Sequence, residues 1–349
     1  MKINKLNKLW LCLFAIAAAC LVLFANTAIA NAANNNENKM YTGLKAIAPY
    51  THQITFSDFE YDSDLQTIST DKVFGCSSVR NGNYYGRNFD YIYNDTPEFV
   101  VRMKASDERY ASIGVAQHWG LREADLLAKS YDKQLELVPN LTLDGINENG
   151  VVANINVVPR QDVAEVTGTN PDGEKLHMLH MVRYILDNAA SATEAVDLLA
   201  GRNIYGDLGD KYLHLMVADE KKTYIVEFLD NKLVAKEKTG NEQIMTNYYN
   251  NLDDYTEHAM GVERYQILQN NYDMSNSVEG MFELLQKVSF NNIGHMDVDN
   301  AWCSDSGMSR TEINTIPRSE AQAFVNNFNK KYFEVRNFES KRAEANPSV

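Results

Sequence analysis

The chain has 349 residues, of which 33 are basic and 47 are acidic, so its formal net charge is −14. Such an excess of acidic side chains repels phosphate groups, which argues against nucleic acid and anionic lipid surfaces as partners. Charged residues make up 23% of the chain and hydrophobic residues 44%, a composition that suits a globular protein with a sizeable core. No internal repeat is evident.

The first thirty residues have the pattern of a secretory signal peptide. Lys2, Lys5 and Lys8 precede an apolar run that ends near Phe24, and Ala28-Ile29-Ala30 supplies the small residues of a cleavage site. A permanent membrane anchor is the alternative, but the cleavage pattern directly after the run favours removal. We expect a secreted or extracytoplasmic protein without stable membrane insertion. Its remaining residues, about 320, are within the range of one domain.

Only two of the four cysteines remain after removal of a signal peptide, because Cys12 and Cys20 lie within it. Cys76 and Cys303 could then form one disulfide, as is common in secreted proteins. No spacing of cysteine and histidine matches a zinc site, and His177 and His180, which share a predicted helix face, have no second ligand pair. The sequence therefore predicts neither a metal nor a cofactor.

Cys76 lies in a predicted hairpin over 73–90, in which two apolar or aromatic runs flank Asn81-Gly82. Asn-Gly is the strongest short-range signal for a two-residue turn. If these two residues form the loop, Cys76 faces Arg87 on the neighbouring strand, with Cβ atoms roughly 4.5–5.5 Å apart. A cation at that distance favours the thiolate, which attacks carbonyl carbons. We therefore predict a catalytic centre in this hairpin.

The first half of the chain otherwise reads as a leader followed by strands. Residues 31–75 are polar and turn-rich, typical of a leader that packs on the domain without being needed in the final fold. Beyond the hairpin, β-branched and aromatic residues predict strands over 99–103, 111–115 and 151–158, the last of these after a turn over 144–150. Asn154 and Asn156 lie two residues apart in a strand and therefore share one face.

The second half predicts two helices, a group of strands and two further helices. Helical spacing covers 176–188, and Ser191 with Glu194 forms a capping box for a second helix that Gly201 ends. Strands are predicted over 212–217, 223–228, 232–236 and 243–247, followed by a helix that contains Arg264 and another over 278–285. Strands, paired helices and strands again indicate a layered α+β architecture.

Four short motifs give the chain a resemblance to the choloylglycine hydrolase and acid-ceramidase-like branch of the N-terminal nucleophile (Ntn) amide hydrolases. They are Gly75-Cys76, Gly86-Arg87-Asn88-Phe89-Asp90, the stretch from Asp144 to Gly150 with the strand after it, and Met245-Thr246-Asn247. The resemblance implies a four-layer αββα sandwich of antiparallel sheets. It also implies self-cleavage between Gly75 and Cys76, which would leave 76–349 as a single domain with Cys76 at its N-terminus.

The resemblance also implies roles for individual residues. Cys76 is the nucleophile, and its freed α-amine, with an ordinary pKa of about 7.7–8.0, accepts the thiol proton. Arg87 holds the thiolate, Asp90 orients the amine, and Asn247 holds the amine or the oxyanion. Asn156 is the second oxyanion candidate, with Asn154 as its alternative. Arg264 matches a late arginine of the family, although pairing on a helix surface with Glu257 or Glu263 is an alternative for it.

These features together predict a secreted cysteine amidase that acts on a small linear, non-peptide amide with an apolar acyl part. The family's substrates include bile-salt conjugates, penicillin V and fatty acyl amides, and the sequence does not select among them. Acyl transfer from the same thioester is one alternative. The other is a secreted binding protein without activity, in which Cys76 and Cys303 form a disulfide. Self-association into a homo-oligomer is left open.

Overall fold

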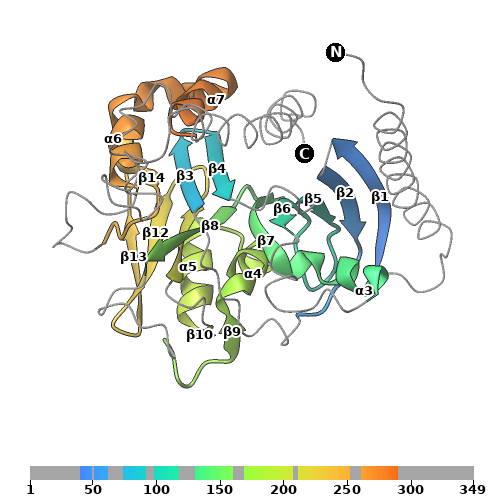
Figure 1. The fold of residues 1–349 in the computed structure, drawn as a ribbon. Helices are drawn as coiled ribbons and strands as arrows, with labels where there is room; N and C mark the ends of the chain where they lie inside the picture. Colours follow the sequence, from blue (N-terminus) through green and yellow to red (C-terminus); the bar gives the residue numbers. More distant parts are fainter. Residues whose placement is uncertain are drawn as a thin grey trace, which may run out of the picture.

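The computed structural model describes residues 40–48, 51–61, 74–91, 98–117, 130–159, 169–206, 211–251 and 261–289. Within these ranges the chain forms three sheets and several short helices, so the predicted α+β class is confirmed (Figure 1). The predicted signal peptide, the predicted cleavage motif around residue 30 and Cys303 lie outside the described residues.

The largest sheet contains nine strands among the described residues. All neighbouring strands in it are antiparallel except for one parallel pair, β2 and β5, which corrects the expectation of purely antiparallel sheets. The parallel pair can form because the long connection between these two strands includes a complete hairpin. In sheet order the strands are β1 (Tyr41–Ala48), β2 (Thr51–Phe56), β5 (Glu98–Met103), β6 (Ser112–Gln117), β7 (Thr142–Asn147), β8 (Val152–Pro159), β11 (Lys211–Ala218), β12 (Thr223–Leu229) and β13 (Lys232–Glu237).

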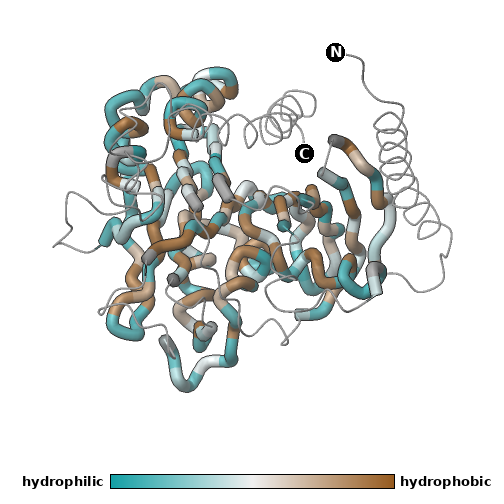
Figure 2. Tube along the Cα trace, in the orientation of Figure 1, coloured by the Kyte–Doolittle hydropathy of each residue, from teal (hydrophilic) through white to brown (hydrophobic). Residues whose placement is uncertain are grey.

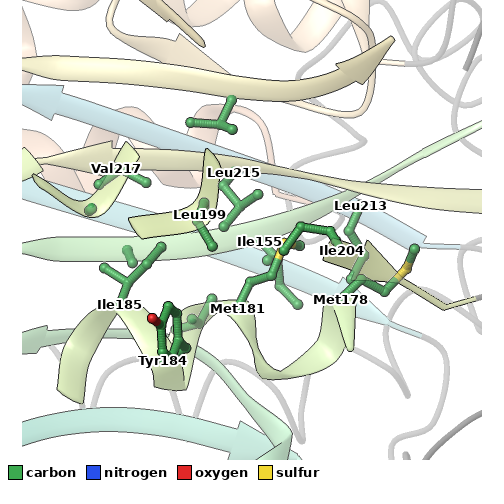
Figure 3. Close-up of a cluster of buried hydrophobic side chains, with 14 of the residues drawn as sticks. Ile155, Met178, Met181, Tyr184, Ile185, Leu199, Ile204, Leu213, Leu215 and Val217 are labelled. Atoms are coloured by element: carbon green, nitrogen blue, oxygen red, sulfur yellow. The ribbon is translucent and has the colours of Figure 1, made fainter. Parts of the chain in front are cut away.

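Helices α4 (Met181–Asn188) and α5 (Ala192–Ala200) cover one face of this sheet (Figure 1). Their buried side chains, including Met181 and Leu199, form one core cluster with Ile155 of β8 and Leu215 of β11 (Figure 3). Figure 2 shows hydrophobic segments along the strands in the middle of the molecule and hydrophilic turns at its edge. Because side chains alternate along a strand, the even-numbered neighbours in β8 and β11 point to the opposite face of the sheet.

A second sheet of three strands packs on that opposite face. Its order is β14 (Ile244–Met245), β3 (Phe74–Asn81) and β4 (Tyr84–Tyr91). Asn154 of β8 donates a hydrogen bond across the gap to Ser78 Oγ at 2.8 Å. The other face of the small sheet is covered by α6 (Val262–Asn270) and α7 (Val278–Lys287), which bury Val79 and Ile244. The small sheet therefore lies between the large sheet and these two helices.

The remaining elements are short strands, one short helix and 3-10 turns. They are β9 (Lys175–His177), which pairs in parallel with β10 (Asn203–Tyr205), helix α3 (Tyr131–Glu136), and the 3-10 turns η2 (Val138–Leu141), η3 (Met178–His180), η4 (Gly240–Glu242) and η5 (Tyr272–Asn276). The longest helix that the structure describes, α7, has ten residues, and no described helix qualifies as a membrane span.

Local sequence signals explain where several elements begin and end. Ser191 caps α5 by accepting from the Glu194 N–H at 3.1 Å, as predicted. The β12–β13 turn uses Asp230 and Asn231 with φ of 49° and 58°, a left-handed pair that Asp and Asn tolerate better than most residues. The helix predicted over 176–188 begins later, at Met181. Residues 175–177 form β9 instead, and His177 Nδ1 accepts from Leu179 N.

The predicted leader contributes two strands to the large sheet, which the sequence interpretation missed. β2 pairs with β5 over six positions, from Thr51 to Phe56. Ile54 and Phe56 are fully buried in a cluster with Phe99 and Val101 of β5. Side chains extend the contact, since Asp58 forms an ion pair with Arg109 at 2.7 Å, and Tyr41 and Tyr61 donate to Asp132 and Asp187. Residues 40–48 and 51–61 are thus an integral part of this fold.

The hairpin at Cys76 forms, but in a different register from the predicted one. Asn81 pairs with Tyr84, so the two-residue loop is Gly82-Asn83 rather than Asn81-Gly82. Gly82 has φ of +59°, which suits glycine at the first position of a tight hairpin turn. Cys76 therefore pairs with Phe89, and Arg87 pairs with Ser78. Arg87 is consequently a diagonal neighbour of Cys76, at a spacing that a long side chain can still span.

Candidate active site

Cys76 lies on β3 and is fully buried, with 0% of the residue exposed. Strand β14 pairs with Ser78 and Val79 of β3 and ends before it reaches Cys76. Instead of a strand partner on that side, the backbone N–H of Cys76 donates to Oδ1 of Asn247, at 2.8 Å. A side chain just beyond β14 thus holds the backbone nitrogen that cleavage would convert into an α-amine.

Arg264 joins Asn247 to the chain at Cys76. Its Nη1 donates to the carbonyl oxygen of Cys76 and, at 3.0 Å, to Oγ of Ser77. Its Nη2 donates to Asn247 Oδ1 at 2.6 Å. Arg264 is only 2% exposed, so it does not lie on the helix surface as the alternative supposed, and the side chains of Glu257 and Glu263 are outside the described part of the structure. Such charge-assisted bonds from one planar guanidinium fix two segments relative to each other.

Gly261, at the start of α6, leaves the space in which Arg264 and Asn247 meet. Its φ is +85°, a conformation that residues with a Cβ rarely adopt. A Cβ built at Gly261 would lie 2.9 Å from each of three atoms: Arg264 Nη2, Asn247 N and Thr246 Oγ1. The Gly261 carbonyl accepts from Thr246 Oγ1 at 2.9 Å. This residue is therefore required by space and by backbone conformation together.

Arg87 extends from β4 towards the large sheet and is held by two of its strands. Nη1 forms an ion pair with Asp144 Oδ2 at 2.8 Å, and Nη2 donates to the Ile155 carbonyl at 2.7 Å. Burial alone would lower the pKa of Arg87, but the electrostatic influence of Asp144 and Cys76 outweighs it, so this pKa is raised. Arg87 is therefore a permanent cation diagonal to Cys76, and its role in holding the thiolate stays a prediction.

Asn154 and Asn156 of β8 face the small sheet, and both are buried. Asn156 Nδ2 donates to the carbonyls of Met245 and Thr246 at 3.2 and 3.1 Å, while Asn154 Nδ2 donates to Ser78 Oγ and Asn156 Oδ1. Asn247 Nδ2 donates to the Val157 carbonyl at 2.7 Å. The amide N–H groups of Asn156 and Asn247 thus bind backbone carbonyls and that of Asn154 binds side chains, so an oxyanion role for Asn156 or Asn154 stays a prediction.

Asp90 lies in β4 opposite Gly75, one position from the pair formed by Cys76 and Phe89. This places its backbone beside the bond that is predicted to be cut. The side chain of Asp90 is outside the described part of the structure, so its predicted role in orienting the amine stays a prediction.

Three polar residues beside Cys76 were not predicted as site residues. Asp144, interpreted as part of a turn, begins one of the four motifs and is the countercharge of Arg87. Ser78 and Tyr85 lie on the same face of the hairpin as Cys76 and Arg87. Burial, and secondly the charge of Asp144, raises the pKa of the Tyr85 hydroxyl well above its ordinary value, which keeps the hydroxyl neutral. The period-two spacing of positions 85 and 87 could have revealed Tyr85.

Within the ranges described, no group of three or more histidine, cysteine, aspartate and glutamate side chains could hold a metal ion. His177 and His180 contact each other, with ring centroids 5.6 Å apart. The chemistry available at Cys76 is accordingly that of a buried thiol, its backbone nitrogen, two arginines and several amides.

These features define a class: an α+β protein with a buried cysteine between two sheets, whose backbone is held by an arginine and an amide side chain. Residues 139–296 match the family model described as acyl-coenzyme A:6-aminopenicillanic acid acyl-transferase. This region contains Asp144, Asn156, Asn247 and Arg264, whereas Cys76 and Arg87 precede it. The resemblance predicted from the motifs is confirmed by this match, and with it the prediction of an enzyme.

The chain is also similar to solved structures of penicillin V acylase from Agrobacterium tumefaciens and of conjugated bile acid hydrolase from Clostridium perfringens. The first similarity has 18% identity and a TM-score of 0.38, and covers 64% of this chain and 67% of the acylase. For two variants of the hydrolase, identities are 15% and 16%, TM-scores are 0.30 and 0.34, and coverage is 54% and 52% of this chain. The matches span 48% and 54% of the hydrolase chains. TM-scores this low assign no substrate. No curated protein sequence matches the chain.

Proposed function

We propose that the chain is a secreted cysteine amidase of the Ntn hydrolase class, which cleaves a small linear amide through a thioester on Cys76. The observation that carries this proposal is the contact between the backbone N–H of Cys76 and Asn247 Oδ1, at 2.8 Å. The nitrogen of this cysteine is held by a side chain beside two cationic residues. That is the placement needed for an α-amine that must exchange protons with the adjacent thiol.

The first step of the proposed reaction sequence is maturation. Cys76 Sγ attacks the Gly75 carbonyl and the acyl group moves from nitrogen to sulfur. Water then cleaves this thioester, which leaves a carboxylate on Gly75 and an amine on Cys76. Asn247 Oδ1 already lies within hydrogen-bond distance of that nitrogen, and Arg264 fixes the Cys76 carbonyl. The amine is thus held in place as it forms.

Turnover uses the same groups. The α-amine takes the thiol proton while Sγ adds to the substrate carbonyl, and the cation of Arg87 stabilises the thiolate. The proton then passes to the leaving nitrogen, the C–N bond breaks and the amine departs. Water attacks the thioester, which releases the acid and restores the thiol. In this scheme an amide donor from the group that includes Asn156 stabilises the oxyanion.

The predicted arrangement of the whole protein belongs to this proposal. The packing of α4 and α5 on the large sheet, and of α6 and α7 on the small sheet, supports the four-layer αββα sandwich of Ntn hydrolases. We propose that residues 1–30 direct export and are removed. Cleavage then separates residues 31–75 from a second part, residues 76–349. Strand β1 pairs with β2, and β2 pairs with β5 of the second part, which supports a cut segment that stays bound.

Acyl transfer is a second candidate function, because the matched family model is described as an acyl-transferase. The same thioester serves both reactions, and the outcome depends on whether water or another nucleophile reaches it. A panel of glycine- and taurine-conjugated bile salts, penicillin V and N-acyl amines, assayed for released amine, tests amide cleavage. Adding hydroxylamine and measuring hydroxamate detects the thioester that both reactions share, and a new amide formed from an added amine in place of free acid indicates transfer.

Two cysteine variants make this test decisive. Cys76→Ser should abolish amine release from the substrate that the wild-type protein cleaves, because an alcohol is a far weaker nucleophile at neutral pH. Cys303→Ser, which removes the disulfide partner of the binding-protein alternative, should retain turnover. Full activity of Cys76→Ser would refute the nucleophile. An inactive wild-type protein with an intact Cys76–Cys303 disulfide would favour the binding protein.

A further inference from the structure

A row of three buried polar side chains crosses the large sheet behind the segment that carries Asn247. Asn156 on β8 pairs with His214 on β11. His214 in turn lies opposite Glu227 on β12, one position beyond the pair Leu215 and Val226. The three residues are 1%, 0% and 0% exposed. Neither His214 nor Glu227 has a role in the proposed reaction, and buried polar groups of this kind need a reason.

All three side chains bind the backbone of residues 245–251. His214 Nε2 lies 2.9 Å from the Thr246 carbonyl, which also accepts from Asn156. At the other end of the segment, Glu227 Oε1 and Oε2 accept from the N–H groups of Asn250 and Asn251 at 2.6 and 2.9 Å. His214 and Glu227 thus hold the two ends of the segment, and Asn247 lies between these ends.

His214 and Glu227 also bind each other, since Nδ1 lies 3.2 Å from Oε1. The Thr246 carbonyl can only accept, so Nε2 carries a hydrogen. His214 therefore bridges the Thr246 carbonyl and the Glu227 carboxyl group through its two ring nitrogens, and Glu227 in turn accepts from two backbone N–H groups.

We propose that His214 and Glu227 are positioning residues for the amidase reaction, which hold the 245–251 backbone so that Asn247 Oδ1 meets the Cys76 nitrogen. The inference rests on the proposed function. His214 acts through one bond, to the carbonyl of the residue directly before Asn247. A displacement of this backbone moves the group that orients the α-amine, and an error of about 1 Å in such an alignment can reduce turnover on the order of 100-fold.

The test compares three variants, using the substrate that the wild-type protein cleaves fastest in the amide panel. His214→Met removes both bonds and should lower kcat about 100-fold while KM changes less than about threefold, because His214 is fully buried and acts only through the 245–251 backbone and Glu227. His214→Gln keeps an amide N–H able to reach the Thr246 carbonyl, and its kcat should be at least tenfold higher than that of His214→Met. Glu227→Gln places an NH₂ group against a backbone N–H and should lower kcat about tenfold.

Asn147→Ala is a matched control. Like Glu227, Asn147 is buried and accepts from two backbone N–H groups, those of Asn149 and Val151. It lies at the β7–β8 turn, far along the sheet from residues 245–251. This variant should lower the melting temperature without lowering kcat. If it lowers kcat as much as His214→Met at a similar melting temperature, the effect is general destabilisation and the proposal is overturned.

Wild-type kcat in folded His214→Met and Glu227→Gln would also overturn the proposal. If His214→Met does not fold, His214→Gln and Glu227→Gln decide the question: a lower kcat at constant KM supports positioning, and wild-type kcat in both refutes it. Failure of the proposed function has a separate signature. In that case the wild-type protein itself releases no amine from any amide in the panel and its chain still includes the residues before Cys76.

Discussion

Replacing Gly261 by alanine tests the geometry around Asn247 and Arg264. The left-handed φ of +85° costs an alanine about 1–2 kcal/mol relative to glycine. Three atoms at 2.9 Å from the new Cβ must also move, and one of them is the backbone nitrogen of Asn247. Overpacking of this kind costs about 1–3 kcal/mol. We therefore expect Gly261→Ala to lower the free energy of unfolding by about 2–5 kcal/mol.

Gly150→Ala separates the two contributions. Gly150 has a similar φ of +78°, but no atom lies within 4 Å of the position that a Cβ would take there. Gly150→Ala should therefore lower the free energy of unfolding only by the backbone contribution, about 1–2 kcal/mol, and keep full activity. Urea unfolding of both variants in an inactive Cys76→Ala background measures stability. The rate of amine release, measured with Cys76 intact, should fall at least tenfold for Gly261→Ala alone. Equal destabilisation by both substitutions, with unchanged turnover, would refute the described packing.

Three further predictions concern charge, pH and the leader. Asp144→Asn leaves Arg87 without its countercharge. A broken buried pair costs about 3–5 kcal/mol, and because Asp144 is 19% exposed we expect the free energy of unfolding, measured in urea, to fall by less, about 2–3 kcal/mol. Burial, and secondly His177, lowers the pKa of His180 to about 3. Below pH 6.5 the unfolded chain therefore binds a proton that the folded chain does not, and stability should fall by at most about 1.4 kcal/mol per pH unit. The raised pKa of Asp187 acts in the opposite direction, so the measurement compares wild type with His180→Leu, which should lose less stability between pH 6.5 and 4. Lastly, the segment that contains β1 and β2 should copurify with the cleaved domain in buffer and separate in urea. Its loss in buffer would show that the β2–β5 pairing is too weak to retain it.

Much of the fold could be predicted from local signals, because these depend on a few neighbouring residues. The cap of α5 by Ser191, with Glu194 three residues on, was predicted correctly. The predicted hairpin register was wrong because Asn81-Gly82 and Gly82-Asn83 both suit a two-residue turn, and the second one forms. Short polar strands such as β1 and β2 were missed because their burial depends on distant partners, including Phe99.

The site residues likewise divide into those that the sequence predicts and those whose contacts depend on distant parts of the chain. Motifs led to Cys76, Arg87, Asn247 and Arg264, which the structure brings together through hydrogen bonds and a shared face of the hairpin. Asp144 was not predicted as a site residue, because its partner lies 57 positions earlier in the chain. The contacts of His214 and Glu227 likewise depend on strand register between β8, β11 and β12, which periodicity alone does not determine.

The most direct test of the account is the N-terminus of the purified protein. Intact mass and N-terminal sequencing should find a chain that begins at Cys76, together with a second fragment that ends at Gly75. The Cys76→Ala variant should remain uncut. Amide cleavage by a wild-type chain that still carries Gly75 joined to Cys76 would contradict the claim that the nitrogen held by Asn247 becomes the catalytic amine.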